Sequence, residues 1–307
     1  SYAEDSGYMR AKHILFMTVD EEGNALPDEE IEAQEQAAQE ALRSHLERKG
    51  GFYTILLSGV DDGNGGSDTN ILVAVDTVNG YIYGVSIPRD SKAFIDGKVH
   101  KINYAYNKGG TELLASTVSE QLGIPVDYTV SVDLKGFTAL VDAIGGVDFE
   151  VPINMDYDDP IQGLSIHFKK GMQHLSGADA LRVVRFRHNN DGTGYGSEDL
   201  GRMQTQQKFL KAVAKKMLSA GNILTKIDDY ARIFQQYVDT DLSVGNLAWL
   251  GTEALKMGLD SIDFSTLPNE WKSPYIYLNP DETLTLVNTY LNPYVEDRTA
   301  EDLHLPS

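Results

Sequence analysis

The feature that most constrains the fold is an alternation of short apolar runs with amphipathic stretches, which begins at Phe52. Runs such as YTILLSGVD and TNILVAVD have the length and composition of strands, and Asn79–Gly80 marks a hairpin turn after the second. The stretches GGTELLASTVSEQLG, KGFTALVDAIGG and SEDLGRMQTQQKFLKAVAKKML have helical periodicity. Helices that alternate with strands predict an α/β fold in which helices cover the faces of a sheet.

Charge and composition narrow the possible partners. The 307 residues carry a formal net charge of −20 and include no cysteine. So acidic a chain is a poor binder of nucleic acid, because phosphate neutralisation needs an excess of lysine and arginine. An anionic ligand must therefore meet a local basic site.

Membrane signals are absent from this sequence. No run approaches 18 apolar residues, and the opening SYAEDSGYMRAK lacks the apolar core of a secretory signal. A chain cut after a membrane anchor and a cytosolic chain would both have this appearance.

Four of the ten arginines fall between Leu181 and Gln207. The run ALRVVRFRH resembles a strand, on which Arg185 and Arg187 would leave the same face and form a bidentate clamp for phosphate oxygens. The alternative for such a pair is cross-strand pairing with some of the 46 acidic residues.

A glycine-rich loop and a helix follow these arginines. The loop HNNDGTGYGSED is expected to be mobile and able to fold over a ligand. Asp199, Arg202 and Gln206 then recur at helical spacing and share one stripe. The stripe predicts a contribution to the same site, although the spacing alone is equally typical of a solvated helix face.

Two further segments bring charged groups to the ends of predicted strands. Asp61, Asp62 and Asp68 suit Mg²⁺, which takes one or two carboxylates and completes its shell with water and phosphate oxygens, although acids are also ordinary turn residues. Arg89 at the sheet rim and Lys101 before a helix are weak signals singly. The chain has no P-loop, HExxH or GxSxG motif, and its seven histidines lack the spacing of a zinc site.

Six motifs, taken in order, resemble those of the LytR–CpsA–Psr family of cell-wall phosphotransferases. The resemblance covers about 52–218 and extends over the remaining elements to about Tyr294. The motifs are ILLSGVD…SDTNILVAVD, VSIPRDS, KINYAYNKGG, VDLKGFTALVDAIGGVDFEV, KKGMQHLSGADALRVVRFRH and EDLGRMQTQQKFLKAV.

The resemblance implies a membrane-anchored extracellular enzyme of a Gram-positive-type bacterium. Such an enzyme takes a glycopolymer, such as a teichoic acid or capsule polymer, from a polyprenyl-pyrophosphate carrier. It joins that polymer to a peptidoglycan hydroxyl through a phosphodiester. The implied fold is a layered α/β/α sandwich with a central mixed sheet, and an apolar channel between sheet and helices receives the isoprenoid tail.

The resemblance also assigns roles, residue by residue. Asp61 and Asp68 match the acids that place Mg²⁺, and Asp199 matches an acid expected to activate the acceptor hydroxyl or to orient Arg202. The catalytic group is then Asp199, Arg202 and Arg89. The residues expected to hold the pyrophosphate oxygens are Arg89, Arg185, Arg187 and Arg202, with Lys101 and Gln206 as further polar contacts.

Two positions depart from the family pattern. Gly66 and Thr205 stand where the family commonly has arginine, so one or two cations are missing from the expected site. Removing one oriented donor from a comparable site costs about 3 kcal/mol of transition-state stabilisation. The alternatives of polyprenyl-pyrophosphate hydrolysis without transfer, and of a non-catalytic module that binds the lipid carrier, therefore stay open.

The predicted organisation has three parts. An accessory strand and helix occupy 1–51, the catalytic domain occupies 52–296, and a tail occupies 297–307. The first 45 residues or so resemble the opening of a parvulin-type prolyl isomerase, but His13 alone cannot make that active site, and no isomerase activity is predicted.

Overall fold

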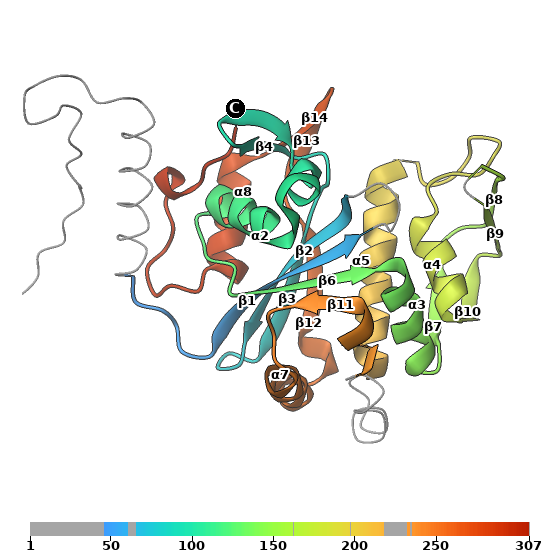
Figure 1. Ribbon diagram of the computed structural model, residues 1–307, viewed down its shortest axis with the longest axis horizontal. Helices are drawn as coiled ribbons and strands as arrows, with labels where there is room; N and C mark the ends of the chain where they lie inside the picture. The colour runs from blue at the N-terminus through green and yellow to red at the C-terminus, as the bar shows by residue number, and fades with distance from the viewer. Residues whose placement is uncertain are drawn as a thin grey trace, which may run out of the picture. The chain divides into compact units, whose positions relative to one another are not determined.

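The computed structural model describes residues 46–60, 66–161, 163–196, 198–217, 232–233 and 235–306, with backbone only for 198–200 and 259. The chain divides into two compact units: Ser1–Arg48 with Tyr294–Glu296, and Lys49–Pro293 with Asp297–Ser307. The strand and helix predicted for the N-terminal segment, and His13, lie outside the described residues. The helices and strands labelled in Figure 1 all belong to the second unit.

A six-stranded sheet forms the centre of this unit, with the strand order β11-β6-β1-β2-β3-β12. The pairs β1–β6 and β3–β12 are parallel, and the other three pairs are antiparallel. The predicted mixed sheet is therefore confirmed. Its strands are β1 (Phe52–Val60), β2 (Ser67–Asp76), β3 (Tyr81–Ile87), β6 (Tyr128–Asp133), β11 (Val238–Thr240) and β12 (Ile262–Thr266).

The turn between β2 and β3 is the predicted hairpin. Gly80 has φ of +74°, a left-handed conformation that favours glycine. The Asp76 carboxylate accepts hydrogen bonds from the backbone amides of Val78 and Asn79 at 3.0 and 2.8 Å. The hairpin thus closes through local side-chain and backbone chemistry already visible in the sequence.

Neighbouring residues of the central strands pack on opposite faces of the sheet, as strand geometry requires. Leu56 and Leu72 belong to the core beneath α2 (Asn103–Leu122), whereas Ile55 and Ile71 belong to the core that includes side chains of α7 (Val244–Met257). Because both faces are covered, the strands are apolar runs rather than alternating ones. Figure 1 shows helices on both sides of the sheet.

Besides the cores on the two faces of the sheet, a separate core, here called the second core, lies beside the sheet among α3 (Leu134–Ala143), α4 (Gly177–Arg185) and α5 (Glu198–Met217). It also packs against short two-stranded ribbons. The ribbons of the unit are β4 (Lys92–Ile95) with β5 (Lys98–Lys101), β7 (Val147–Val151) with β10 (Gly171–Leu175), β8 (Met155–Asp159) with β9 (Leu164–Phe168), and β13 (Asn269–Lys272) with β14 (Tyr275–Leu278). The remaining elements are α8 (Pro280–Leu286), η1 (Leu259–Ser261), η2 (Val287–Leu291) and η3 (Ala300–Asp302).

The prediction of a strand over ALRVVRFRH was wrong, because these residues form most of helix α4 and the extended segment after it. Ser176 caps the helix by accepting a hydrogen bond from the Asp179 amide. Ala180 and Val183, three residues apart, are both fully buried in the second core. The cap and this helical spacing outweigh the strand preference of the two adjacent valines.

Asp68 and Arg89, two of the predicted site residues, lie at the same edge of the sheet. The parallel strands β1 and β6 both end there, since Val60 is paired with Asp133. The antiparallel strand β2 begins there, and β3 ends there just before Arg89. Among the described residues, no helix is both long and apolar enough to cross a bilayer.

Candidate functional site

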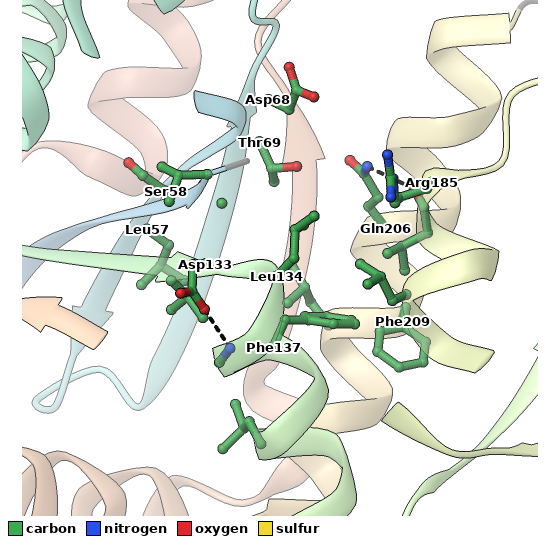
Figure 2. A pocket seen from close by; sticks show the side chains of 18 of the residues that line it. Leu57, Ser58, Asp68, Thr69, Asp133, Leu134, Phe137, Arg185, Gln206 and Phe209 are labelled. Carbon is green, nitrogen blue, oxygen red and sulfur yellow. Dashed lines mark hydrogen bonds between the residues drawn. The ribbon is translucent and has the colours of Figure 1, made fainter. Parts of the chain in front are cut away.

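A cavity of about 600 Å³ opens at this edge, between the sheet and helices α3, α4 and α5 (Figure 2). Most of its walls are aliphatic and aromatic, and it corresponds to the predicted apolar channel. The apolar lining comprises Leu57, Ile71, Val130, Val132, Leu134, Phe137, Leu140, Leu164, Leu181, Val184, Phe186, Phe209 and Leu210 among others.

Charged and amide side chains meet at one end of this cavity. Figure 2 shows Asp68 and Thr69 from β2 facing Arg185 and Gln206 across it, with Phe137 and Phe209 deeper along the walls. A smaller pocket of about 30 Å³ adjoins this end and shares four lining residues with the cavity: Asp68, Thr69, Arg202 and Gln206. The ligand space therefore has an apolar part and a cationic mouth.

The end of α4 brings two arginines to the cavity. The helix ends at Arg185, and Phe186 continues in an extended conformation with its ring 1% exposed in the second core. Arg185 and Arg187 flank this anchor and both line the cavity. The sequence thus predicted that the two residues act together, although the helix end and not a strand face brings them there.

Helix α5 supplies the opposite part of the mouth. Arg202 is only 9% exposed, and Gln206 Nε2 donates to the Val184 carbonyl at 3.1 Å, which ties α5 to the end of α4. Both side chains line the cavity, so for them a merely solvated helix face is excluded. Asp199 lies in the first turn of α5, but its side chain is outside the described residues.

A chain of ion pairs borders the smaller pocket. Arg89 pairs directly with Asp68, and the Asp90 carboxylate lies 3.7 Å from Arg89 Nε and 3.2 Å from Lys101 Nζ. Arg89 and Asp90 line the smaller pocket, whereas Lys101 reaches it only through Asp90. The predicted residues Arg89 and Lys101, weak signals singly, are therefore neighbours at one site.

The two departures from the family pattern have different surroundings. Thr205 is 2% exposed, and its hydroxyl donates to the Gly201 carbonyl at 2.9 Å and lies 3.0 Å from the Tyr195 hydroxyl. A side chain added at Gly66 would first meet Asn107 Oδ1, at 3.3 Å from its Cβ. Position 205 is thus an interior position in this chain, while position 66 lies beside helix α2.

One carboxylate of the predicted metal site lies at the cavity mouth. Asp68 lies at the cavity mouth with 54% of its side chain exposed, whereas Asp61 and Asp62 lie outside the described residues. Within the part of the chain that the structure describes, no group of three or more His, Asp or Glu side chains forms a metal-binding cluster. An exposed carboxylate beside cations that can bind phosphate fits Mg²⁺, which binds proteins through one or two carboxylates.

Sequence reasoning missed Asp133, which lines the cavity at the end of β6. Its carboxylate caps helix α3 by accepting a hydrogen bond from the Gly136 amide at 2.6 Å (Figure 2). An aspartate directly before a helical stretch is a recognisable N-cap signal, so this residue could have been found.

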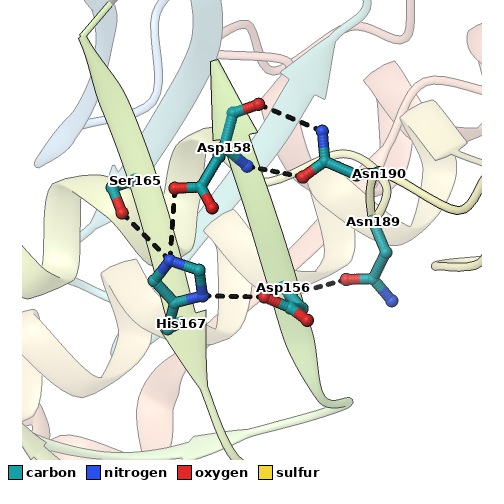
Figure 3. Close-up of polar contacts among 6 residues, drawn as sticks. All are labelled: Asp156, Asp158, Ser165, His167, Asn189 and Asn190. Carbon is teal, nitrogen blue, oxygen red and sulfur yellow. Dashed lines mark hydrogen bonds and ion pairs between the residues drawn. The ribbon is translucent and has the colours of Figure 1, made fainter. Parts of the chain in front are cut away.

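The second wall of the cavity was also missed. Tyr157 and Leu164 from the β8–β9 ribbon line the cavity, and the His188 ring packs edge-on against Tyr157 with centroids 5.5 Å apart. Asn189 and Asn190 accept hydrogen bonds from the backbone amides of β8 at 2.7 and 2.6 Å (Figure 3). The first half of the loop that was expected to be mobile is therefore hydrogen-bonded to this wall.

A charged cluster lies on the same ribbon. The His167 ring contacts Asp156 at 2.7 Å through Nδ1, and through Nε2 it contacts Asp158 at 3.2 Å and Ser165 at 3.0 Å (Figure 3). The hydrogen bond to Asp156, with the charge of Asp158, raises the pKa of His167 above 6.5. The hydrogen bond from Ser165, with the nearby His167, lowers the pKa of Asp158 below 3.8.

Comparison with known proteins agrees with this geometry. The LytR_cpsA_psr family matches residues 14–291. The chain belongs to this family. Like the motifs of the sequence, the match spans both the cavity and its cationic mouth.

The chain is similar in sequence to two curated proteins that are named as transferases. The chain is 33% identical over 267 residues to the polyisoprenyl-teichoic acid–peptidoglycan teichoic acid transferase TagV of Bacillus subtilis, and covers 66% of that protein and 83% of itself. It is 38% identical over 195 residues to the corresponding TagU of Bacillus cereus, covering 60% of that protein and 62% of itself. The chain thus spans less than two thirds of these relatives.

A solved structure supports the same family fold. The crystal structure of B. subtilis TagV superposes with a TM-score of 0.66 at 29% identity, covering 78% of this chain and 96% of that one.

Proposed function

We propose that this LytR–CpsA–Psr protein transfers a glycopolymer from a polyprenyl-pyrophosphate carrier to a hydroxyl of peptidoglycan, as a membrane-anchored enzyme outside a Gram-positive-type cell. The proposal rests on one observation: a cavity of about 600 Å³ has mostly apolar walls and, at one end, a mouth lined by arginines. A lipid pyrophosphate has the same two parts, an apolar tail and a dianionic or trianionic head. The names of TagV and TagU support a polyisoprenyl-linked donor and a peptidoglycan acceptor.

The reaction is a displacement at phosphorus. The acceptor hydroxyl oxygen forms a bond to the phosphorus that bears the glycopolymer, and the bond from that phosphorus to the bridging oxygen breaks. Polyprenyl phosphate leaves, the glycopolymer becomes phosphodiester-linked, and the hydroxyl proton is taken up by a base. Such transfers depend mainly on positioning and on cations around the transition state.

Different residues bind the phosphates and take up the proton in this reaction. Arg185, Arg187 and Arg202 bind the pyrophosphate oxygens, because a guanidinium is a fixed, bidentate donor that remains charged. Arg89 supplies a fourth cation from the smaller pocket, where Asp68 and Asp90 orient it. Asp199, in the first turn of α5 and three residues before Arg202, takes the acceptor proton or orients that arginine.

Magnesium belongs to this proposal as a cofactor held by Asp68 and Asp61. When bound, it neutralises phosphate charge that the arginines leave uncompensated. Asp68, which pairs with Arg89, would also hold the metal, since Mg²⁺ binds proteins through one or two carboxylates.

A binding experiment tests the proposal. The melting temperature of the protein is measured with and without an isoprenyl pyrophosphate, in the presence of Mg²⁺. We expect a rise that Arg185→Ala and Arg187→Ala each abolish, because each removes a cation from the cavity mouth. The matched control is Arg182→Ala on the same helix, whose guanidinium pairs with Asp179 at 3.0 Å and does not line the cavity.

Turnover then separates transfer from its alternatives. Release of polyprenyl phosphate that requires a peptidoglycan acceptor supports transfer. Release without acceptor indicates a pyrophosphate hydrolase. Tight binding with no release indicates a lipid-carrier binding module, the alternative that the missing cation at the interior position Thr205 favours. No rise in the melting temperature of the wild-type protein would contradict the proposal.

A further inference from the structure

The β13–β14 ribbon borders the cationic mouth. Strand β12 is parallel to β3, so both strands end at the edge of the sheet where the mouth lies, and β13 begins just after β12. The backbone amide of Ile276 on β14 donates to the carbonyl of Asp90 at 2.9 Å, and Ile276 also bridges Ser91. The ribbon is therefore fixed to the segment that carries Arg89. Figure 1 shows it beside β4.

Trp271 occupies a distinctive position on this ribbon. It lies directly opposite Ile276 in the antiparallel register, so the two side chains leave the same face with their Cβ atoms about 5 Å apart. Ile276 is 9% exposed and lines the smaller pocket together with Arg89 and Arg202. Trp271 is 57% exposed. The indole thus leaves the ribbon on the same face as Ile276, but it is largely exposed and lines neither pocket itself.

The contrast with Trp249, the second of the two tryptophans, shows what is unusual. Trp249 packs edge-on against Tyr53 with ring centroids 5.3 Å apart, on helix α7, which contributes no residue to either pocket, whereas Ile276, opposite Trp271, lines the smaller pocket. Beside Trp271, Asn269 lies two residues earlier on the same strand face and provides an amide, whose Nδ2 donates to the Leu267 carbonyl at 2.6 Å. An exposed aromatic ring with a polar amide at the rim of a charged pocket is a common composition for a ligand subsite.

The direction of the ligand follows from the two pockets. If the isoprenoid tail fills the apolar cavity and the phosphates meet the arginines, the first sugar beyond the phosphates leaves through the mouth that Arg89 and Ile276 border. A sugar ring presents an apolar face of C–H groups and an edge of hydroxyls. An exposed indole matches that face, and an amide matches that edge.

We infer that Trp271 is a binding residue for a pyranose ring next to the pyrophosphate site, an assignment that rests on the proposed function. The ring comes either from the glycopolymer on the donor or from the glycan strand of the acceptor. Both present the same chemistry to the indole, and the experiment below distinguishes them.

Tryptophan fluorescence tests the inference without any turnover. In the Trp249→Phe protein, Trp271 is the sole tryptophan. Its emission is followed during titration with a tetramer of N-acetylglucosamine, as acceptor probe, and with an isoprenyl pyrophosphate that bears one N-acetylglucosamine, as donor probe. The bare isoprenyl pyrophosphate is the reference for the donor probe. The complementary Trp271→Phe protein, in which Trp249 alone reports, is the matched control.

We expect a saturable change with one of the sugar probes in the Trp271 protein and none in the control. A response to the tetramer assigns the ring to the acceptor, and a response to the sugar-bearing pyrophosphate beyond that of the bare one assigns it to the donor. No difference between the two proteins with either probe would overturn the inference.

Kinetics provide the second measurement. Trp271→Ala should raise the KM of the substrate that carries the ring about tenfold, with kcat changed less than about twofold, and Trp271→Tyr should restore most of the loss. The melting-temperature rise with the bare isoprenyl pyrophosphate should stay the same in Trp271→Ala. An unchanged KM for both substrates would refute the role of Trp271. Absence of the rise in the wild-type protein would instead refute the proposed function, while the fluorescence result would still decide the sugar contact.

Discussion

The volume of the apolar cavity sets the length of the tail that it can hold. About 600 Å³ are available in the cavity together with its cationic mouth, and a water-sized group occupies about 30 Å³ in a condensed phase, so at most roughly 20 carbon atoms, or about four isoprene units, fit inside. Burial of one methylene contributes about 0.8 kcal/mol, so one fully buried five-carbon unit contributes at most about 4 kcal/mol. That upper limit corresponds to about a thousandfold in affinity. We expect the affinity to rise by tenfold or more per unit from two to four units, and then to level off.

Isothermal titration calorimetry with isoprenyl pyrophosphates of two to six units, kept below their micelle concentrations and with Mg²⁺ present, measures this dependence. Leu134→Trp, which places a larger side chain in the cavity wall, should move the plateau to a shorter tail. Leu255→Trp, the same substitution on α7 and outside the cavity lining, is the matched control. An affinity that is independent of tail length would refute the cavity as the tail site.

Three further predictions concern the walls of the site. NMR titration should give His167 a pKa above 6.5, and Asp156→Asn should lower that pKa. The raised pKa of His167 stabilises the β8–β9 ribbon below pH 6.5, and the lowered pKa of Asp158 stabilises it above pH 3.8. Amide protection of the ribbon should therefore be greatest between these two pH values, and protection that does not depend on pH would contradict this. Phe209→Ala removes a ring that is 0% exposed and should cost about 3–5 kcal/mol in urea unfolding; a loss below about 1 kcal/mol would mean that the second core is not packed there. Gln207→Leu removes an amide donor that lies 2.8 to 2.9 Å from three acceptors on β3 and β12, and it should lower the free energy of unfolding by about 1–3 kcal/mol. An unchanged free energy of unfolding would show that α5 is held to the sheet by other contacts.

The mixed sheet and most helices could be predicted from the sequence because their local signals agree with their tertiary surroundings. The strands around Leu56 and Leu72 are apolar on both faces because both faces are covered, and Asn79–Gly80 carries its own turn chemistry. The segment around Val183 and Val184 was predicted wrongly because its strand preference conflicts with a helix cap that lies seven residues earlier, at Ser176.

The site was predicted less completely than the fold. Arginines grouped in one segment predict a binding site for phosphate. The structure places Arg185 and Arg187 together at the cavity, although their predicted secondary structure was wrong, because they flank the buried Phe186. Asp133 has a local N-cap signal, but Tyr157 and the asparagines that fix the loop to β8 have none. Their roles depend on which segments fold side by side, and periodicity within one segment does not contain that information.

The most direct test of the central claim is a crystal structure of the protein with an isoprenyl pyrophosphate and Mg²⁺. The account predicts phosphate oxygens within hydrogen-bond distance of Arg185, Arg187 and Arg202, with the tail inside the cavity between the sheet and α3, α4 and α5. Phosphates bound away from these guanidinium groups, or a tail that lies outside that cavity, would contradict it.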